Sequence, residues 1–172
     1  RERQLIYEVT RKEEQYLQAI AGKTAELYAT SCRIGGIVGG AERDVINKLT
    51  EFGHAYGMAF QVVDDILDLV ATDEELGKPS GNDIREGVYT LPVIRMIASG
   101  DPVKELLGGP LDEKTRDQAR AAVVNGPEIA SSIETAQNFV DRALSTVEDL
   151  PATPGMQGMR DAATNLLSAL NR

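Results

Sequence analysis

Apolar residues recur along most of the chain at the three- and four-residue spacing of helices that bury one face. No stretch shows the strict alternation of a half-buried strand joined to another by a tight hairpin turn. The pattern predicts a first helix that begins near Thr10, is weakened by the glycines at 35–36 and ends at those at 39–40. Further helices are predicted near 44–71, 112–124, 127–149 and 154–171, with a shorter helix that has Pro92 in its first turn. One helical turn closed by Gly77 and a loop over 78–83 are expected after the second helix. We therefore expect an all-α bundle.

The first predicted helix has a recognisable beginning and a distinct apolar face. Thr10 and Glu13 match a capping box, in which each side chain satisfies a backbone N–H of the first turn. The residues expected on the apolar face are Leu17, Ile20, Thr24, Leu27, Ser31 and Ile34. Lys23 would lie at the edge of this face, where a lysine more often extends its charge into solvent than binds a ligand.

The helix predicted over 44–71 is apolar on nearly every side but carries one narrow acidic stripe. At about 100° per residue, its polar and small positions share a sector roughly 100° wide. These positions are Gly57, Gln61, Asp64, Asp65 and Asp68. A surface helix has a broad face of mixed charge, whereas this pattern predicts a buried helix whose stripe lines a polar cavity. Gly57 weakens the helix, so we expect a bulky group to pass close to its backbone.

Three carboxylates, those of Asp64, Asp65 and Asp68, would repel one another in such a cavity. Either their pKa values rise or a divalent cation holds them together. Oxygen ligands without histidine or thiolate favour Mg²⁺, which usually shares its coordination shell with substrate phosphate. The alternative is a solvated acidic turn, which the spacing alone would favour. The apolar surroundings favour the metal site.

Basic residues are available on either side of the acidic stripe. Lys78 follows Gly77 in a loop that can fold back over the carboxylates, and Asp83 lies in the same loop. Lys23 and Thr24 belong to the first helix. Carboxylates, Mg²⁺ and two lysines together suggest a diphosphate, whose charge they could balance as it leaves.

The composition limits which binding partners and which cellular compartment we expect. The chain has 172 residues, enough for one domain, and its formal net charge of −9 argues against nucleic acid or an anionic membrane as partner. The single cysteine, Cys32, and the single histidine, His54, lack the partners that a nucleophilic or metal site needs, and a reduced, cytoplasmic setting is expected. The opening "RERQLIYEVT" has no initiator methionine and is already apolar, so we expect it to lie inside a longer protein.

Three segments, "GKTAELYATSCRIGG", "GMAFQVVDDILD" and "LGKPSGNDIREGVYTLPVI", resemble the C-terminal half of the trans-prenyltransferases, the polyprenyl diphosphate synthases. The resemblance covers most of the chain and is strongest over 13–97. It implies an isoprenoid synthase-type helical bundle, of which 1–172 would be the C-terminal part of a single domain. It also implies Mg²⁺-dependent head-to-tail condensation of isopentenyl diphosphate with an allylic diphosphate, carried out by an enzyme that is a homodimer.

The resemblance assigns roles to the residues already singled out. For the metal it implies Asp64 as a direct ligand, Asp65 and Asp68 as ligands of the ion or its waters, and Asp83 in support of the metal shell. For the substrate it implies Lys23, Gln61 and Lys78 on the allylic diphosphate, with Thr24 against the cation or the leaving group. Val88 departs from the pattern, because many relatives have lysine there, which puts a second basic contact in doubt.

Other functions are also compatible with parts of this sequence. The family's first aspartate-rich motif and its isopentenyl diphosphate site would lie upstream of Arg1, so the 172 residues alone are expected to be inactive. A non-catalytic partner subunit of a heteromeric synthase is one alternative, although the acidic motif with Gln61 and Lys78 argues against it. A terpene cyclase on the same fold is another, but such enzymes usually carry an Asn/Ser/Glu set in place of this motif. A helical interaction domain would leave the acidic stripe unexplained.

Overall fold

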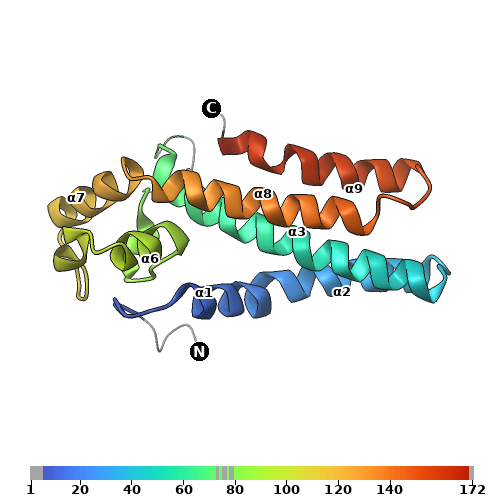
Figure 1. Cartoon of the computed structure of the whole chain (residues 1–172), viewed down its shortest axis with the longest axis horizontal. Helices are drawn as coiled ribbons and strands as arrows, with labels where there is room; N and C mark the ends of the chain where they lie inside the picture. Colours follow the sequence, from blue (N-terminus) through green and yellow to red (C-terminus); the bar gives the residue numbers. More distant parts are fainter. Residues whose placement is uncertain (1–5, 73, 75–76, 78–79, 171–172) are drawn as a thin grey trace. The chain divides into compact units, whose positions relative to one another are not determined.

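The computed structural model describes residues 6–72, 74, 77 and 80–170, and every regular element within them is helical (Figure 1). The all-α prediction is confirmed. The helices are α1 (Glu13–Ile20), η2 (Ala21–Ala25), α2 (Glu26–Val38), α3 (Arg43–Val70), α5 (Asn82–Glu86), α6 (Leu91–Ala98), η3 (Pro102–Leu106), α7 (Glu113–Val124), α8 (Glu128–Thr146), α9 (Pro154–Asn165) and η4 (Leu166–Leu170). None of the described helices is long and apolar enough to cross a membrane.

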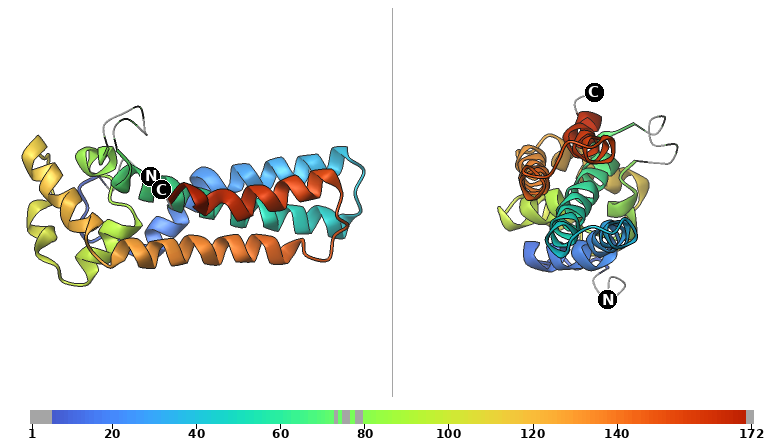
Figure 2. Two further views of the ribbon diagram at one scale, coloured as in Figure 1. Left: turned by 90° about the horizontal axis from the view of Figure 1, so that it is seen from above. Right: turned by 90° about the vertical axis from the view of Figure 1, so that its right-hand side faces the viewer.

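The chain forms two compact units. The first contains Arg1–Ala19 and Asp64–Ile133, and the second contains Ile20–Val63 and Glu134–Arg172. The division falls within α3, between Val63 and Asp64. In the second unit the axes of α2, α3, α8 and α9 run along the same direction. Figure 1 and both views of Figure 2 show this arrangement.

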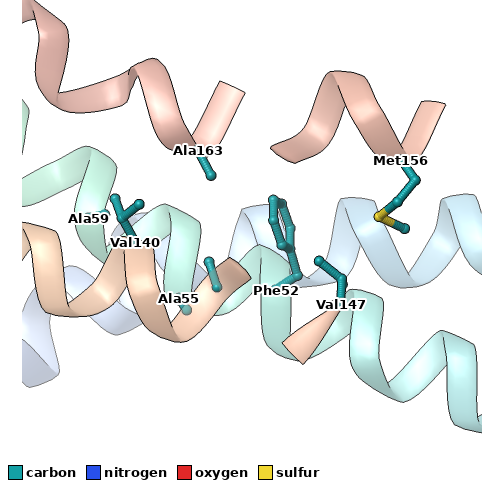
Figure 3. Packing of buried hydrophobic residues seen from close by; sticks show 8 residues of the cluster. Phe52, Ala55, Ala59, Val140, Val147, Met156 and Ala163 are labelled. Carbon is teal, nitrogen blue, oxygen red and sulfur yellow. The ribbon is translucent and has the colours of Figure 1, made fainter. Parts of the chain in front are cut away.

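The core of the second unit joins α3, α8 and α9 through small and apolar side chains (Figure 3). Its buried members are Phe52, Ala55, Ala59, Val140, Ala143, Val147, Met156 and Ala163. Alanine occupies several of these positions, so the helix backbones can approach closely. Arg160 closes one end of this core by donating to the carbonyl of Val147 at 2.7 Å and to that of Leu150 at 2.9 Å.

Two glycines of α3 let this helix pack directly against the backbone of η2 and α2. A Cβ on Gly57 would lie 2.7 Å from Ala25 Cα, and one on Gly53 would lie 2.5 Å from the carbonyl oxygen of Tyr28. Such distances leave no room for a side chain. The expected close approach at Gly57 is therefore present, and the approaching group is the neighbouring helix.

The buried face of α2 differs from the expected one. Leu27 and Ile34, expected inside, are 67% and 54% exposed, whereas Ala25 and Ala29 are buried. The cause is η2, a π-helical turn in which the Glu26 N–H bonds to the carbonyl of Ala21. A π turn adds one residue to the helix, so every later position rotates by about one residue.

The first helix also begins differently from the expected capping box. Thr10 donates from its backbone N–H and its hydroxyl to the carboxylate of Glu8, and α1 starts at Glu13. The Lys12 N–H donates to Gln15 Oε1 at 2.8 Å. Gln15 therefore accepts the backbone N–H at the start of the helix, which is the role expected of Glu13. Glu13 instead accepts two hydrogen bonds from Arg95 of α6, at 2.6 and 3.1 Å. The bidentate contact with a guanidinium outweighs a local cap.

Most of the remaining helices follow their sequence signals. Pro92 lies in the first turn of α6, and the Asp112 side chain caps α7 by accepting the Thr115 N–H at 2.7 Å. The loop expected over 78–83 is wrong at its end, because Asn82 and Asp83 begin α5. Most of the single turn expected before Gly77 lies outside the described residues.

Candidate functional site

The three carboxylates of the acidic stripe lie in the last two turns of α3 but differ in burial. Asp65 and Asp68 are only 6% and 4% exposed, whereas Asp64 is exposed. The expectation of one enclosed cavity around all three is therefore wrong for Asp64. Two of the carboxylates are buried in the interior of the first unit, and the third is exposed.

Asp65 is held by a tyrosine of α1. The hydroxyl of Tyr16 donates to Asp65 Oδ2 at 2.7 Å, and Tyr16 is 1% exposed. Burial raises the pKa of Tyr16 well above its ordinary value, and the negative charge of Asp65 raises that pKa further. The phenol is therefore protonated at neutral pH and acts as a hydrogen-bond donor to the carboxylate.

A buried arginine supports this tyrosine. Arg11 is 7% exposed, and its guanidinium carbon lies 5.6 Å from the centroid of the Tyr16 ring. Its Nη1 donates to the carbonyl of Tyr89 at 2.9 Å, which fixes the guanidinium against the backbone. A cation over an aromatic face is attracted by the ring, so Arg11 and Tyr16 stabilise each other's position.

Asp68 ties the segment after α3 back onto the helix. Its Oδ2 accepts the Asp83 N–H at 3.1 Å, and its carbonyl accepts the Gly81 N–H at 2.7 Å. Gly81 has a φ of 68°, a left-handed conformation that glycine adopts without strain. Asp83 is thereby placed at the start of α5, close enough to Tyr16 for its charge to contribute to the raised pKa of that phenol. Asp65, Asp68 and Asp83 all belong to the first unit.

Arg120 of α7 closes the end of the acidic helix. Its Nε donates to the carbonyl of Leu69 at 2.7 Å, and its Nη2 donates to that of Ala71 at 3.1 Å. The last carbonyls of a helix have no partner within the helix and carry partial negative charge. A guanidinium there satisfies both and fixes the end of α3 next to the carboxylates.

A second pair of expected site residues meets in the other unit. Thr24 Oγ1 donates to Gln61 Oε1 at 2.7 Å, and Gln61 is 7% exposed. Thr24 and the exposed Lys23 both belong to the π turn η2. Single π turns inside α-helices occur often at functional sites, because they displace side chains from the regular helical register. Lys78 lies outside the described residues.

The donor set suits a hard divalent cation by its chemistry. Carboxylates are the oxygen ligands that Mg²⁺ prefers, and this ion commonly takes one or two of them and completes its shell with waters and phosphate oxygens. Over 6–72, 74, 77 and 80–170, no three His, Cys, Asp or Glu side chains are gathered closely enough to hold an ion by themselves. The fit to a hard divalent cation therefore rests on the oxygen-donor chemistry of these carboxylates.

Sequence reasoning missed Tyr16, Arg11 and the π turn. Tyr16 and Asp65 are 49 positions apart, and nothing local to either residue predicts the hydrogen bond. The π turn shows itself in the structure, where the buried positions Ile20 and Ala25 are five residues apart and a regular helix would give three or four.

Comparison with known proteins gives a consistent result. A family model described as "Polyprenyl synthetase" matches residues 3–125. A geranylgeranyl diphosphate synthase of Saccharolobus solfataricus is 38% identical over 146 residues, covering 82% of this chain and 44% of that protein. The heptaprenyl diphosphate synthase component 2 of Geobacillus stearothermophilus is 37% identical over 152 residues, covering 86% of this chain and 47% of that protein.

Solved structures of the same class have the same fold. A heptaprenyl diphosphate synthase from Staphylococcus aureus matches with a TM-score of 0.92 and 25% identity, over 97% of this chain and 54% of that chain. A polyprenyl synthase from Caulobacter crescentus, complexed with calcium and isoprenyl diphosphate, matches with a TM-score of 0.90 and 28% identity, over 97% and 53%. The chain thus spans about half the length of the relatives it matches. Sequence and all-α fold agree, and the chain belongs to the polyprenyl synthetase family.

Proposed function

We propose that these residues are the C-terminal part of a single prenyl diphosphate synthase domain. The complete enzyme would join isopentenyl diphosphate head-to-tail to an allylic diphosphate and would require Mg²⁺. Relatives named as geranylgeranyl, heptaprenyl and nonaprenyl diphosphate synthases support this assignment. The observation that carries it is the acidic end of α3, where two carboxylates are buried in fixed hydrogen bonds beside a third that is exposed.

The differing burial of the carboxylates suggests a different role in metal binding for each of them. Asp64 is exposed and would coordinate the ion directly. Asp65 and Asp68, held by Tyr16 and by the backbone of Asp83, would accept from the ion's waters and keep its position constant. Asp83 would support the same shell from α5. Bound Mg²⁺ supplies positive charge that stabilises the departing diphosphate.

The residues of η2 and the middle of α3 would hold the allylic diphosphate. Gln61 Oε1 accepts from Thr24, which holds the Gln61 side chain in one orientation, and Gln61 would bind a phosphate oxygen from there. Lys23 would add a positive charge from the π turn, and Lys78 would add another from the segment after α3. Thr24 keeps the Gln61 amide in this orientation and would contact the leaving-group region.

The complete protein can be tested directly for chain elongation. It would be incubated with radiolabelled isopentenyl diphosphate and with allylic primers of five, ten and fifteen carbons, with Mg²⁺ or with EDTA. Radioactive prenyl diphosphates longer than the primer, formed only with Mg²⁺, are the expected result. A cyclised hydrocarbon formed without isopentenyl diphosphate would overturn the proposal in favour of a terpene cyclase.

We further propose that the complete enzyme is a homodimer. The relative named "component 2" indicates a two-component synthase in that organism, and a heteromeric enzyme is the competing arrangement. Light scattering of the purified complete protein would give twice the chain mass for the homodimer. Elongation that requires a second, different polypeptide would contradict the homodimer and support a heteromeric synthase.

A further inference from the structure

The acidic end of α3 is tied to a buried tyrosine of α1. Tyr16 and Asp65 are 1% and 6% exposed, and the Tyr16 hydroxyl lies 2.7 Å from Asp65 Oδ2. A hydrogen bond to a carboxylate in so buried a place is stronger than one in water, because little solvent competes for either partner. It therefore restricts the carboxylate to one orientation.

The tyrosine is itself held in place. The Arg11 guanidinium lies over its ring at 5.6 Å, and Arg11 Nη1 is anchored to the Tyr89 carbonyl at 2.9 Å. Tyr16 thus forms the middle of a short chain of contacts that begins at the backbone of Tyr89 and ends at Asp65. All of these residues lie in the first unit. A hydroxyl fixed in this way can impose its geometry on the carboxylate it meets.

We propose that Tyr16 is a positioning residue for the cation site, acting through Asp65. It holds the Asp65 carboxylate in the orientation in which it serves the ion bound next to Asp64, and so raises the affinity of the site for divalent metal. This inference rests on the proposed function only in its identification of the ion as Mg²⁺ and of the substrate as an allylic diphosphate. Removing a residue that hydrogen-bonds to a metal ligand typically lowers the affinity for the metal by about tenfold to a hundredfold.

A matched pair of substitutions separates positioning from simple packing. Tyr16→Phe removes the hydroxyl that meets Asp65, whereas Tyr89→Phe removes a hydroxyl that accepts the Gly108 N–H at 2.8 Å. Both tyrosines are 1% exposed, and each loses one hydrogen bond without a change in ring size. Arg11 donates to the backbone carbonyl of Tyr89, so that hydrogen bond survives the control substitution.

Metal binding would be measured on the complete protein without substrate, with Mn²⁺ as the probe and electron paramagnetic resonance to count free ion. We expect Tyr16→Phe to raise the Mn²⁺ Kd about tenfold, and Tyr89→Phe to leave it within about twofold. In turnover assays, the Mg²⁺ concentration for half-maximal rate should rise by the same factor for Tyr16→Phe. The KM for isopentenyl diphosphate and kcat at saturating Mg²⁺ should change little.

A double substitution tests whether Tyr16 acts through Asp65. In an Asp65→Asn background, Tyr16→Phe should have no further effect on the Mn²⁺ Kd, because the carboxylate that it orients is gone. A full tenfold effect in that background would overturn the proposal, as would equal shifts for Tyr16→Phe and Tyr89→Phe. Circular dichroism and Tm of each variant would confirm that it is folded. If the complete protein makes no prenyl product at all, the proposed function fails, and the Mn²⁺ comparison still decides the role of Tyr16.

Discussion

At the scale of single residues, three neighbouring aspartates with one chemistry have three different environments. Asp65 meets a phenol from α1, Asp68 meets the backbone at the start of α5, and Asp64 is exposed. A buried carboxylate without donors is costly, so the two interior residues need their partners. The exposed one has the access that a direct metal ligand requires.

Replacing Asp64 tests this division. In the complete enzyme, Asp64→Ala should lower turnover at saturating substrate by about 10² or more, because charge stabilisation of the leaving diphosphate is lost in the transition state. Asp44→Ala is the matched control, since it removes another exposed aspartate from the other end of α3. Steady-state rates over a Mg²⁺ titration provide the measurement. Turnover near wild type for Asp64→Ala at every Mg²⁺ concentration would refute the assignment.

Val88 provides a second test at this scale. The resemblance led us to expect lysine at this position, and here the half-buried Val88 donates its N–H to the carbonyl of Asp83 at 2.8 Å. Val88→Lys keeps that backbone contact, and its flexible stem can carry the charge out to solvent. We expect kcat/KM for the allylic diphosphate to change by less than about threefold, or about 0.6 kcal/mol. A loss as large as that of Asp64→Ala would show that the valine itself is required.

At the scale of elements, the contact between α3 and the η2–α2 segment sets where Thr24 and Gln61 meet. This contact requires glycine at positions 53 and 57. A Cβ on Gly53 or Gly57 would collide with backbone atoms of Tyr28 or Ala25 in the neighbouring segment. The π turn then places Lys23 and Thr24, while Ala25 at its end touches Gly57. Packing and the candidate substrate residues are thus coupled through one short segment.

Gly57→Ala should therefore destabilise the protein, although alanine favours helix. The new Cβ would lie 2.7 Å from Ala25 Cα and 3.0 Å from the Tyr28 ring, and the backbone atom cannot move aside alone. Overpacking of about 1–3 kcal/mol should exceed the gain of about 1 kcal/mol in helix propensity. Urea denaturation of the complete protein, followed by circular dichroism, would measure the change in the free energy of unfolding.

Gly35 offers the matched control for this substitution. It lies within α2, and a Cβ there would have no neighbour within 4 Å. Gly35→Ala should be neutral or stabilising by up to about 1 kcal/mol, because only helix propensity changes. If Gly57→Ala were as stabilising as Gly35→Ala, the two helices could not lie as close together as the structure shows.

At the scale of the whole molecule, large apolar side chains remain exposed on one helix. Leu27, Ile34, Ile37 and Val38 of α2 are 67%, 54%, 54% and 81% exposed. On α3, which is apolar on nearly every side, the exposed large apolar side chain is Phe60, at 37%. The larger patch lies on α2 because the π turn rotates its apolar residues outward.

We expect the 172-residue chain alone to associate and to make no prenyl product. Exposed apolar side chains grouped on one helix favour association, and the reaction must hold two diphosphates whereas one acidic motif is present in this sequence. Light scattering at several concentrations and a radiolabelled isopentenyl diphosphate assay would measure the two properties. The double variant Leu27→Gln, Ile34→Gln should reduce the association without changing the helical content. Robust elongation by this chain alone would contradict the prediction.

The sequence by itself determined the helical class, the limits of most helices and the acidic stripe. The long helix was expected over 44–71 and runs over Arg43–Val70, and Pro92 and Asp112 mark helix starts as expected. These features depend on residues within a few positions of one another, so propensity, capping and periodicity are sufficient to predict them.

Only the tertiary structure decided which residues meet across the chain. Glu13 pairs with Arg95 and leaves its expected cap, and the π turn at Ala21–Ala25 changes which face of α2 is buried. The partners of Asp65 and Asp68 come from α1 and α5. The physical reason is that a buried polar group takes the donor that folding brings to it. That donor is set by how distant elements pack, which no local pattern in the sequence encodes.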